Sequence, residues 1–213
     1  MNTEFFIANE LAALIAPPLA LVATLMTGEK WKAKLLLFGQ VAAFIFALAG
    51  STVAMSQSVI NPVIFEQGFL AVRLDLATSC LIAGITFIAA VVVAFSERYL
   101  GGEQSRHKFL CFLSFLSCCA ACLVATDNLI VAFVFWHLLS LGLWRTMLLQ
   151  DNGRSSAATV LRHHFLSDVA MLLALVLVCN STGTMAFSQL PKALPLSNDT
   201  LHLFAVALPV TEG

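Results

Sequence analysis

The chain has 213 residues, of which 60% are apolar and only 11% are charged, and its formal net charge at pH 7 is -1. A soluble domain carries about 25% charged residues, and a chain this short has too much surface for its volume to hide so many apolar side chains. The charge balance also lacks the basic surface typical of nucleic-acid-binding proteins, so no nucleic-acid partner is expected. These values exclude soluble globular, disordered, collagenous and disulfide-rich classes and predict a polytopic membrane protein.

Six apolar runs are long enough, or nearly so, to cross a bilayer, which needs about 20 helical residues. They are Phe6–Met26, Leu35–Met55, Leu74–Phe95, Phe109–Ala125, Asn128–Leu149 and Leu161–Asn180. The predicted fold class is therefore all-α, with residues 1–180 forming a bundle of six transmembrane helices. Only Thr126-Asp127 separates the fourth and fifth runs, which predicts a tight hairpin. Residues 181–213 are expected to form an external tail that could contain the start of a further helix.

The basic residues predict the orientation of these helices. Nine of the eleven Lys and Arg residues lie at or beyond the far ends of the first, third and fifth runs. Because positive charge is enriched on the cytoplasmic side, the N-terminus and the C-terminal tail are predicted to lie outside. A small extracytoplasmic β-hairpin is expected between the second and third helices, where β-branched stretches flank Asn61-Pro62 and Gly68 offers a second turn. Residues 155–164 either lie along the cytoplasmic interface or extend the sixth helix.

Two titratable side chains lie well inside predicted spans. His137 is about nine residues into the fifth run and Asp168 about seven into the sixth. At 1.5 Å per residue the two would be offset by roughly 8 Å along the membrane normal, which favours a water-bridged relay over a direct ion pair. His164 lies one helical turn before Asp168, so contact between those two is feasible.

These positions suggest a proton path through His137, Asp168 and His164. A charge at the bilayer centre costs at least about 2.5–3.5 kcal/mol, so such residues usually have a function. Imidazole titrates near neutral pH and can accept and release protons readily. The alternative is that His137 is neutral and hydrogen-bonded to a backbone carbonyl or to a serine on a neighbouring helix.

The other polar and aromatic side chains in or near the predicted spans are expected to have structural roles. Glu10, Arg145 and Arg162 lie near span ends, where their side chains are expected to reach the interface. The tryptophans and Tyr99 are interpreted as packing or interfacial anchors. The six cysteines all lie in predicted spans and are expected to act as small hydrophobes without disulfides.

A membrane enzyme with a metal bound by His163, His164, Asp168 and a further group is an alternative that the sequence does not favour. Adjacent histidines point about 100° apart on a helix, which makes a shared metal awkward.

Four stretches resemble one known family in the right order and with similar spacing. They are Arg73–Ser79, Ser96–Glu103 with the following Lys108-Phe109, Thr126–Trp136, and Ala157–Asp168. They are similar to motifs of the large antiporter-like subunits of respiratory complex I, whose relatives occur in Mrp-type antiporters and in DAB inorganic-carbon transporters. The resemblance covers most of residues 70–180 and implies the N-terminal part of such a subunit, before the helices that hold the intramembrane lysines.

The departures from that family are informative. Family pumps have Glu directly after the Trp, where this chain has His137, and Arg three residues before the Asp, where it has Phe165. Ser167 replaces the Gly that precedes the Asp. Because the DAB membrane subunit is the more diverged relative, the resemblance favours a DAB-type transporter that accumulates carbon dioxide as bicarbonate, energised by a proton or sodium gradient. The alternatives are a complex I or Mrp-type subunit, or a scaffold in which the relay has decayed.

The resemblance also implies partners. A second membrane subunit would carry the remaining antiporter-like helices, and a large cytoplasmic zinc protein resembling carbonic anhydrase would hold the only metal. Arg98, Arg106 and Lys108 on the predicted cytoplasmic side would dock this partner. The chain itself is expected to have no cofactor and no active site of its own, and to lie in a bacterial inner membrane.

Overall fold

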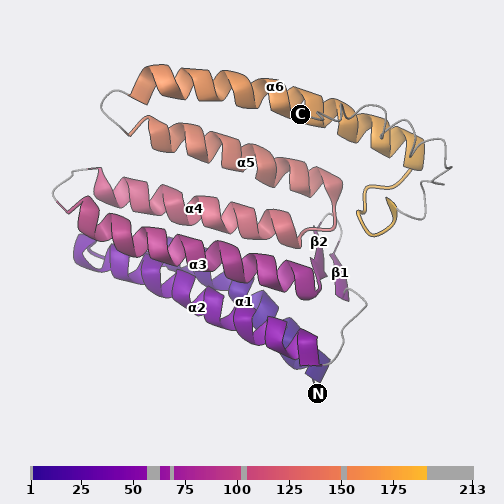
Figure 1. The fold of residues 1–213 in the computed structure, drawn as a ribbon, viewed down its shortest axis with the longest axis horizontal. Helices are drawn as coiled ribbons and strands as arrows, with labels where there is room; N and C mark the ends of the chain where they lie inside the picture. The colour runs from indigo at the N-terminus through magenta and orange to yellow at the C-terminus, as the bar shows by residue number, and fades with distance from the viewer. Residues whose placement is uncertain (1, 57–62, 68–69, 102–104, 150–152, 191–213) are drawn as a thin grey trace, which may run out of the picture.

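The computed structural model describes residues 2–56, 63–67, 70–101, 105–149 and 153–190, which contain six helices that run back and forth along one axis (Figure 1). The helices are α1 (Asn2–Ala23), α2 (Glu29–Ser56), α3 (Leu76–Tyr99), α4 (Arg106–Ala125), α5 (Leu129–Met147) and α6 (Gly153–Thr182). Each is long and apolar enough to cross a membrane. The predicted six-helix bundle is thus confirmed, whereas the side on which the N-terminus lies stays a prediction.

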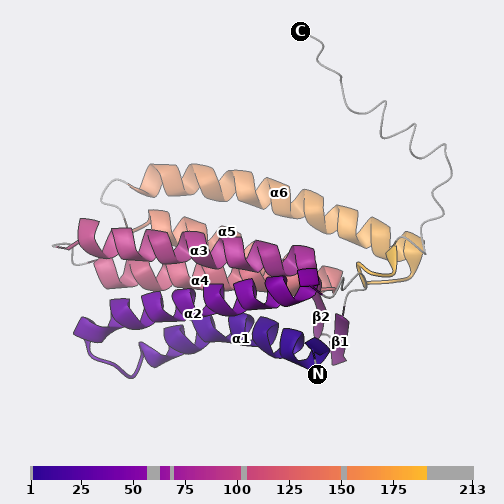
Figure 2. The same cartoon turned by 60° about the horizontal axis from the view of Figure 1, so that its bottom comes forward.

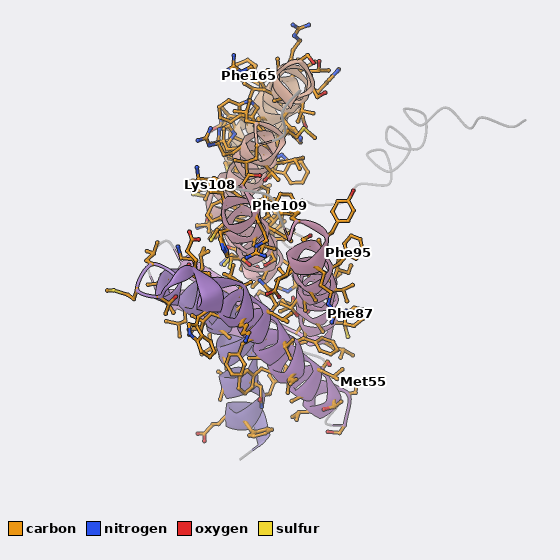
Figure 3. The ribbon with its side chains drawn as sticks, turned by 90° about the vertical axis from the view of Figure 1, so that its left-hand side faces the viewer. Met55, Phe87, Phe95, Lys108, Phe109 and Phe165 are labelled. Atoms are coloured by element: carbon orange, nitrogen blue, oxygen red, sulfur yellow. The ribbon has the colours of Figure 1, made fainter. Side chains whose placement is uncertain are left out.

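The helices stack in nearly the order of the chain. Helices α1 and α2 pack together at one side, α3 and α4 form the centre, and α5 and α6 follow at the other side (Figure 1). In the rotated view α6 lies at the edge of the stack, and its main contact is with α5 (Figure 2). Large apolar side chains such as Met55, Phe87 and Phe95 point outward from α2 and α3 (Figure 3), as expected for surfaces that face lipid.

Small side chains allow close approach at the centre of α1–α4. The largest buried cluster consists of five alanines and one isoleucine: Ala13, Ala47, Ile82, Ala83, Ala121 and Ala125. Helices in lipid associate through such small residues because lipid tails are as apolar as the helices themselves. Gly39 shows how close the approach is, since a Cβ there would overlap the side chain of Ala20 and crowd the backbone carbonyl oxygen of Ala16. Helix α1 continues through Pro17 and Pro18 at this contact.

Two short strands precede α3. Strands β1 (Val63–Gln67) and β2 (Leu70–Leu74) pair antiparallel, with Val63 opposite Leu74 and Gln67 opposite Leu70. The connecting residues 68–69 lie outside the described residues, and the extracytoplasmic position of a hairpin here stays a prediction. Directly after β2, Asp75 caps α3 by accepting a hydrogen bond of 2.8 Å from the Thr78 backbone N–H.

The junction between α4 and α5 is tight, as predicted, and is held by Asp127. This side chain is completely buried, and its two carboxylate oxygens accept hydrogen bonds from the backbone N–H (3.0 Å) and hydroxyl (2.6 Å) of Ser188. The backbone N–H of Asp127 donates to the carbonyl of Ala71 in β2 at 2.8 Å. One residue therefore links β2, the α4–α5 junction and the segment that follows α6.

The sixth helix is longer than the apolar run that predicted it. It begins at Gly153, so residues 155–164 extend the helix instead of forming a separate interfacial segment. After Thr182 the chain turns at Gly183, whose φ of +67° lies in the left-handed region that glycine adopts without strain. The part of the predicted tail beyond residue 190, and with it any start of a further helix there, lies outside the described residues.

Candidate functional site

The two titratable side chains predicted inside the membrane contact each other directly. Nδ1 of His137 on α5 lies 2.6 Å from Oδ2 of Asp168 on α6. The predicted offset of about 8 Å, and the water-bridged relay that it favoured, are therefore wrong. That estimate placed the start of the sixth helix at Leu161, whereas α6 begins eight residues earlier, which moves Asp168 closer to the middle of its helix.

Trp136 completes the surroundings of Asp168. Its indole Nε1–H donates to Oδ1 of Asp168 at 3.1 Å, so each carboxylate oxygen has its own partner. The Asp168 side chain is only 7% exposed, whereas the His137 side chain is 44% exposed. From the sequence, Trp136 was predicted only to be a packing or interfacial anchor. Its contact with Asp168 could have been predicted from its position next to His137. Neighbouring residues point about 100° apart on α5, so the two side chains can reach both oxygens of one carboxylate on the facing helix.

A second polar contact joins the same two helices one turn away. Nδ1 of His164 lies 3.2 Å from Oγ of Ser140, and this hydroxyl is also 3.3 Å from the carbonyl oxygen of Trp136. His164 faces α5 on the side of α6 that carries Asp168, as the spacing of four residues predicted. Its hydrogen-bond partner, however, is Ser140 and not the carboxylate.

A groove of about 420 Å³ lies beside this second contact. It is bounded by α3, α4, α5 and α6, and its wall is apolar except for four residues: Ser117, Trp136, Ser140 and His164. On the α4 side, Ser117 accepts a hydrogen bond of 2.6 Å from Nε2 of the fully buried Gln40 on α2. Gln40 itself does not line the groove, whose surface is almost entirely apolar.

The chemistry available to this arrangement is proton exchange. A carboxylate and an imidazole at 2.6 Å can share one proton, and an indole can only donate. Trp136 therefore fixes the position of Asp168 without itself exchanging a proton, and the exposed imidazole of His137 offers its second ring nitrogen to a donor or acceptor outside the pair. Among the described residues, no three His, Cys, Asp or Glu side chains lie close enough together to hold a metal.

The three residues predicted to dock a partner lie at the same end of the bundle. Arg98 is in the last turn of α3, and Arg106 and Lys108 are in the first turn of α4. Arg98 and Lys108 are exposed and Arg106 is partly exposed, and Figure 3 views the molecule from the end at which Lys108 lies. The opposite end of the bundle carries the strands and the Asp127 junction (Figure 1).

One further prediction was wrong. Glu10 was expected to reach the membrane interface, but its side chain is completely buried between helices. Gln40 and Asp127 are further buried polar residues whose burial was not predicted from the sequence. The hydropathy of their runs is dominated by apolar neighbours, and it does not tell which face of a helix a single polar residue lies on.

Comparisons with known proteins agree with this architecture. Residues 125–211 match the family model described as NADH:quinone oxidoreductase/Mrp antiporter, TM. The chain is 28% identical over 165 residues to the chloroplastic NAD(P)H-quinone oxidoreductase subunit 5 of Piper cenocladum, covering 72% of this chain and 21% of that protein. It is 31% identical over 139 residues to the same subunit of Marchantia polymorpha, covering 61% and 19%. The family model and these relatives support the antiporter-like superfamily of membrane subunits.

A solved structure has the same fold. The membrane-bound sulfane sulfur reductase (MBS), an archaeal respiratory membrane complex, contains a chain that matches 91% of this antiporter-like chain with a TM-score of 0.72. The match covers 40% of that chain at 15% sequence identity, so it describes the arrangement of helices alone. The antiporter-like chain spans about a fifth of the length of the curated relatives named above.

Proposed function

We propose that this antiporter-like chain is a subunit of a proton- or sodium-translocating membrane complex, with His137 and Asp168 in the ion path. The observation that carries the proposal is the 2.6 Å contact between an imidazole and a nearly buried carboxylate in the interior of two spans. Ionisable residues at such depth are rare and mark ion pathways or proton relays in membrane proteins. Subunits named NAD(P)H-quinone oxidoreductase subunit 5 are among its relatives, which supports the same class of complex.

His164 is proposed as the next group in the path. It lies one turn from Asp168 on α6, hydrogen-bonds Ser140 and lines the groove that Ser117 borders from α4. In this proposal a proton leaving the His137–Asp168 pair passes next to His164, which joins α6 to α5 through Ser140. Trp136 is a positioning residue, because it orients the carboxylate without a transferable charge.

Within this class we assign the chain to a DAB-type inorganic-carbon transporter. The support is the residues in which it departs from the complex I pattern, above all His137 in place of Glu and Phe165 in place of Arg. The partners would be a second membrane subunit with the remaining antiporter-like helices and a large cytoplasmic zinc protein docked at Arg98, Arg106 and Lys108. Co-purification from the native membrane, which in this assignment is a bacterial inner membrane, distinguishes this assembly from a set of quinone-reductase subunits.

The ion path is tested in the purified complex reconstituted in vesicles that contain a pH-sensitive dye. Asp168→Asn and His137→Gln keep the side-chain size but remove the exchangeable charge, and each is expected to lower coupled ion movement at least tenfold. Trp136→Phe removes one hydrogen bond and is expected to lower it less. Glu97→Gln, which neutralises a carboxylate near the end of α3, is the matched control and is expected to keep wild-type activity.

The same variants separate transport from a scaffold. Wild-type activity in both Asp168→Asn and His137→Gln, in complexes of normal composition, would contradict the ion path. If charge reversal at Arg98, Arg106 and Lys108 then removed the soluble partner, the chain would be a structural scaffold for that enzyme.

A further inference from the structure

The carboxyl group of Glu10 occupies a closed position between three helices. Glu10 lies six residues into the span that begins at Glu4, or about 9 Å along α1. Its side chain is completely buried, and on α2 the absence of a side chain at Gly50 leaves the space that the carboxyl group fills. A Cβ at Gly50 would overlap the carboxyl oxygen Oε1.

Neither oxygen of this carboxyl group has a hydrogen-bond partner among the described residues. Ser79 on α3 adjoins it, but the Ser79 hydroxyl donates to the backbone carbonyl of Asp75 at 2.9 Å. Ala13 lies three residues after Glu10 on α1 and Ala47 three residues before Gly50 on α2, and both are buried and offer only methyl groups. An ionised carboxylate here would be desolvated and unpaired, which is among the least favourable states for a buried group.

No cation on the surrounding helices reaches this position. On α2 the charged residues are Glu29, Lys30, Lys32 and Lys34, and the nearest of these is sixteen residues from Gly50. On α3 and α4 the charged or imidazole side chains are Glu97, Arg98, Arg106, His107 and Lys108, all at the opposite end of the bundle. The other titratable groups on α3 and α4 are the phenol of Tyr99, at the far end of α3, and the thiols of Cys80, Cys111, Cys118, Cys119 and Cys122. The carboxylate of Asp75 lies at the near end of α3, and Arg73 pairs with it at 2.8 Å.

We propose that Glu10 is a proton-binding site within the membrane, separate from the His137–Asp168 pair. The ligand is a proton because hard metal cations take several oxygen ligands at once, whereas Gly50 beside this carboxyl group has no side chain and Ser79 offers a single hydroxyl oxygen. Release of the proton requires α1, α2 and α3 to part enough for water to enter at Gly50, so proton binding and close packing of the three helices favour each other. This inference goes beyond the proposed function and holds whether or not the other pair conducts.

The test uses a hydrophobic carbodiimide, which modifies protonated carboxyl groups from within the membrane. Native membranes that contain the full complex are treated over a range of pH, and the labelled residues are identified by peptide mass spectrometry. Glu10 is expected to carry the adduct, with labelling that falls as the pH rises. Asp75, which is ionised in its pair with Arg73, is expected to stay unlabelled.

Infrared spectroscopy provides a second readout that does not depend on access of the reagent. Glu10→Gln has nearly the same volume as the native side chain and is expected to remove one protonated-carboxyl band, whereas Glu4→Gln at an exposed position is expected to leave that band unchanged. If the band is present in both variants and Glu10 is unlabelled at every pH, the proposal is overturned. Protection of Glu10 by sodium ions at constant pH would also overturn it, because it would identify a metal cation as the ligand.

Discussion

Helices α1–α4 and the pair α5–α6 have similarly apolar sequences but differ in how much protein covers them. In an apolar stretch of 18 residues in each helix, 33–44% of the residues are buried for α1–α4, compared with 17% for α5 and 6% for α6. Helices α1–α4 are joined mainly by alanines in close contact, whereas α5 and α6 are joined by the polar contacts of Asp168 and His164. Apolarity shows that a helix lies in the membrane, but close packing depends on small residues.

This contrast also separates two kinds of buried polar group. Asp127 and Asp75 lie at the ends of helices, where their carboxylates satisfy backbone N–H groups and fix the course of the chain. Asp168 lies inside a span, and its partners are side chains, one of which can exchange protons. The expectation is that variants of the first kind change stability and variants of the second kind change transport.

Loss of the Asp127 side chain, which links α1–α4 to the segment that follows α6, is expected to have the largest effect on stability. Asp127→Ala leaves the Ser188 N–H and hydroxyl without their acceptor, and hydrogen bonds to charged groups contribute about 1.5–3 kcal/mol each. We expect a loss of about 3 kcal/mol in the free energy of unfolding in detergent micelles, with faster hydrogen exchange in residues 183–190. Asp127→Asn, which keeps one acceptor oxygen, is the control and should lose less. Unchanged exchange in Asp127→Ala would mean that the junction does not hold this segment.

Overpacking is expected to distinguish the two regions directly. Ala47→Leu forces a large side chain into the buried contact of α1–α4 and should cost about 1–3 kcal/mol. Ala170→Leu makes the same change on an exposed face of α6 and should stay within about 0.5 kcal/mol of wild type. The measurement is the midpoint of unfolding in a common detergent. An equal cost at both positions would show that the faces of α6 are as closely covered as the core of α1–α4.

The smallest expected effect concerns the cap of α3. Asp75→Ala removes a carboxylate that accepts from the first turn of the helix, and loss of such a cap costs about 1 kcal/mol. Burial alone would raise the pKa of Asp75, but its hydrogen bonds with Thr78 and the charge of Arg73 lower it below the usual 3.8. Because the folded-state pKa is lowered, this stabilisation is present above pH 3.8 and is lost as the pH falls further. The difference in stability between wild type and Asp75→Ala should therefore shrink in acid, and a difference independent of pH would contradict the role of the carboxylate.

Sequence alone determined the class and number of elements of this antiporter-like chain. Six apolar runs predicted six spans because only a helix satisfies every backbone polar group within lipid, and the motifs around Asp75, Asp127 and Asp168 predicted the superfamily that the comparisons support. The same reasoning singled out His137 and Asp168, because a titratable side chain inside an apolar run stands out from its neighbours.

Only the tertiary structure decided which polar groups meet. Helical periodicity predicts on which face of its own helix a residue lies. It does not predict the height, that is, how far two neighbouring helices are shifted relative to each other along their axes. The direct contact of His137 with Asp168, the role of Trp136 and the burial of Glu10 at Gly50 all depend on that height. It is set by the length of α6, by the small residues that bring α1–α4 together, and by the Asp127 junction, which joins segments far apart in the chain.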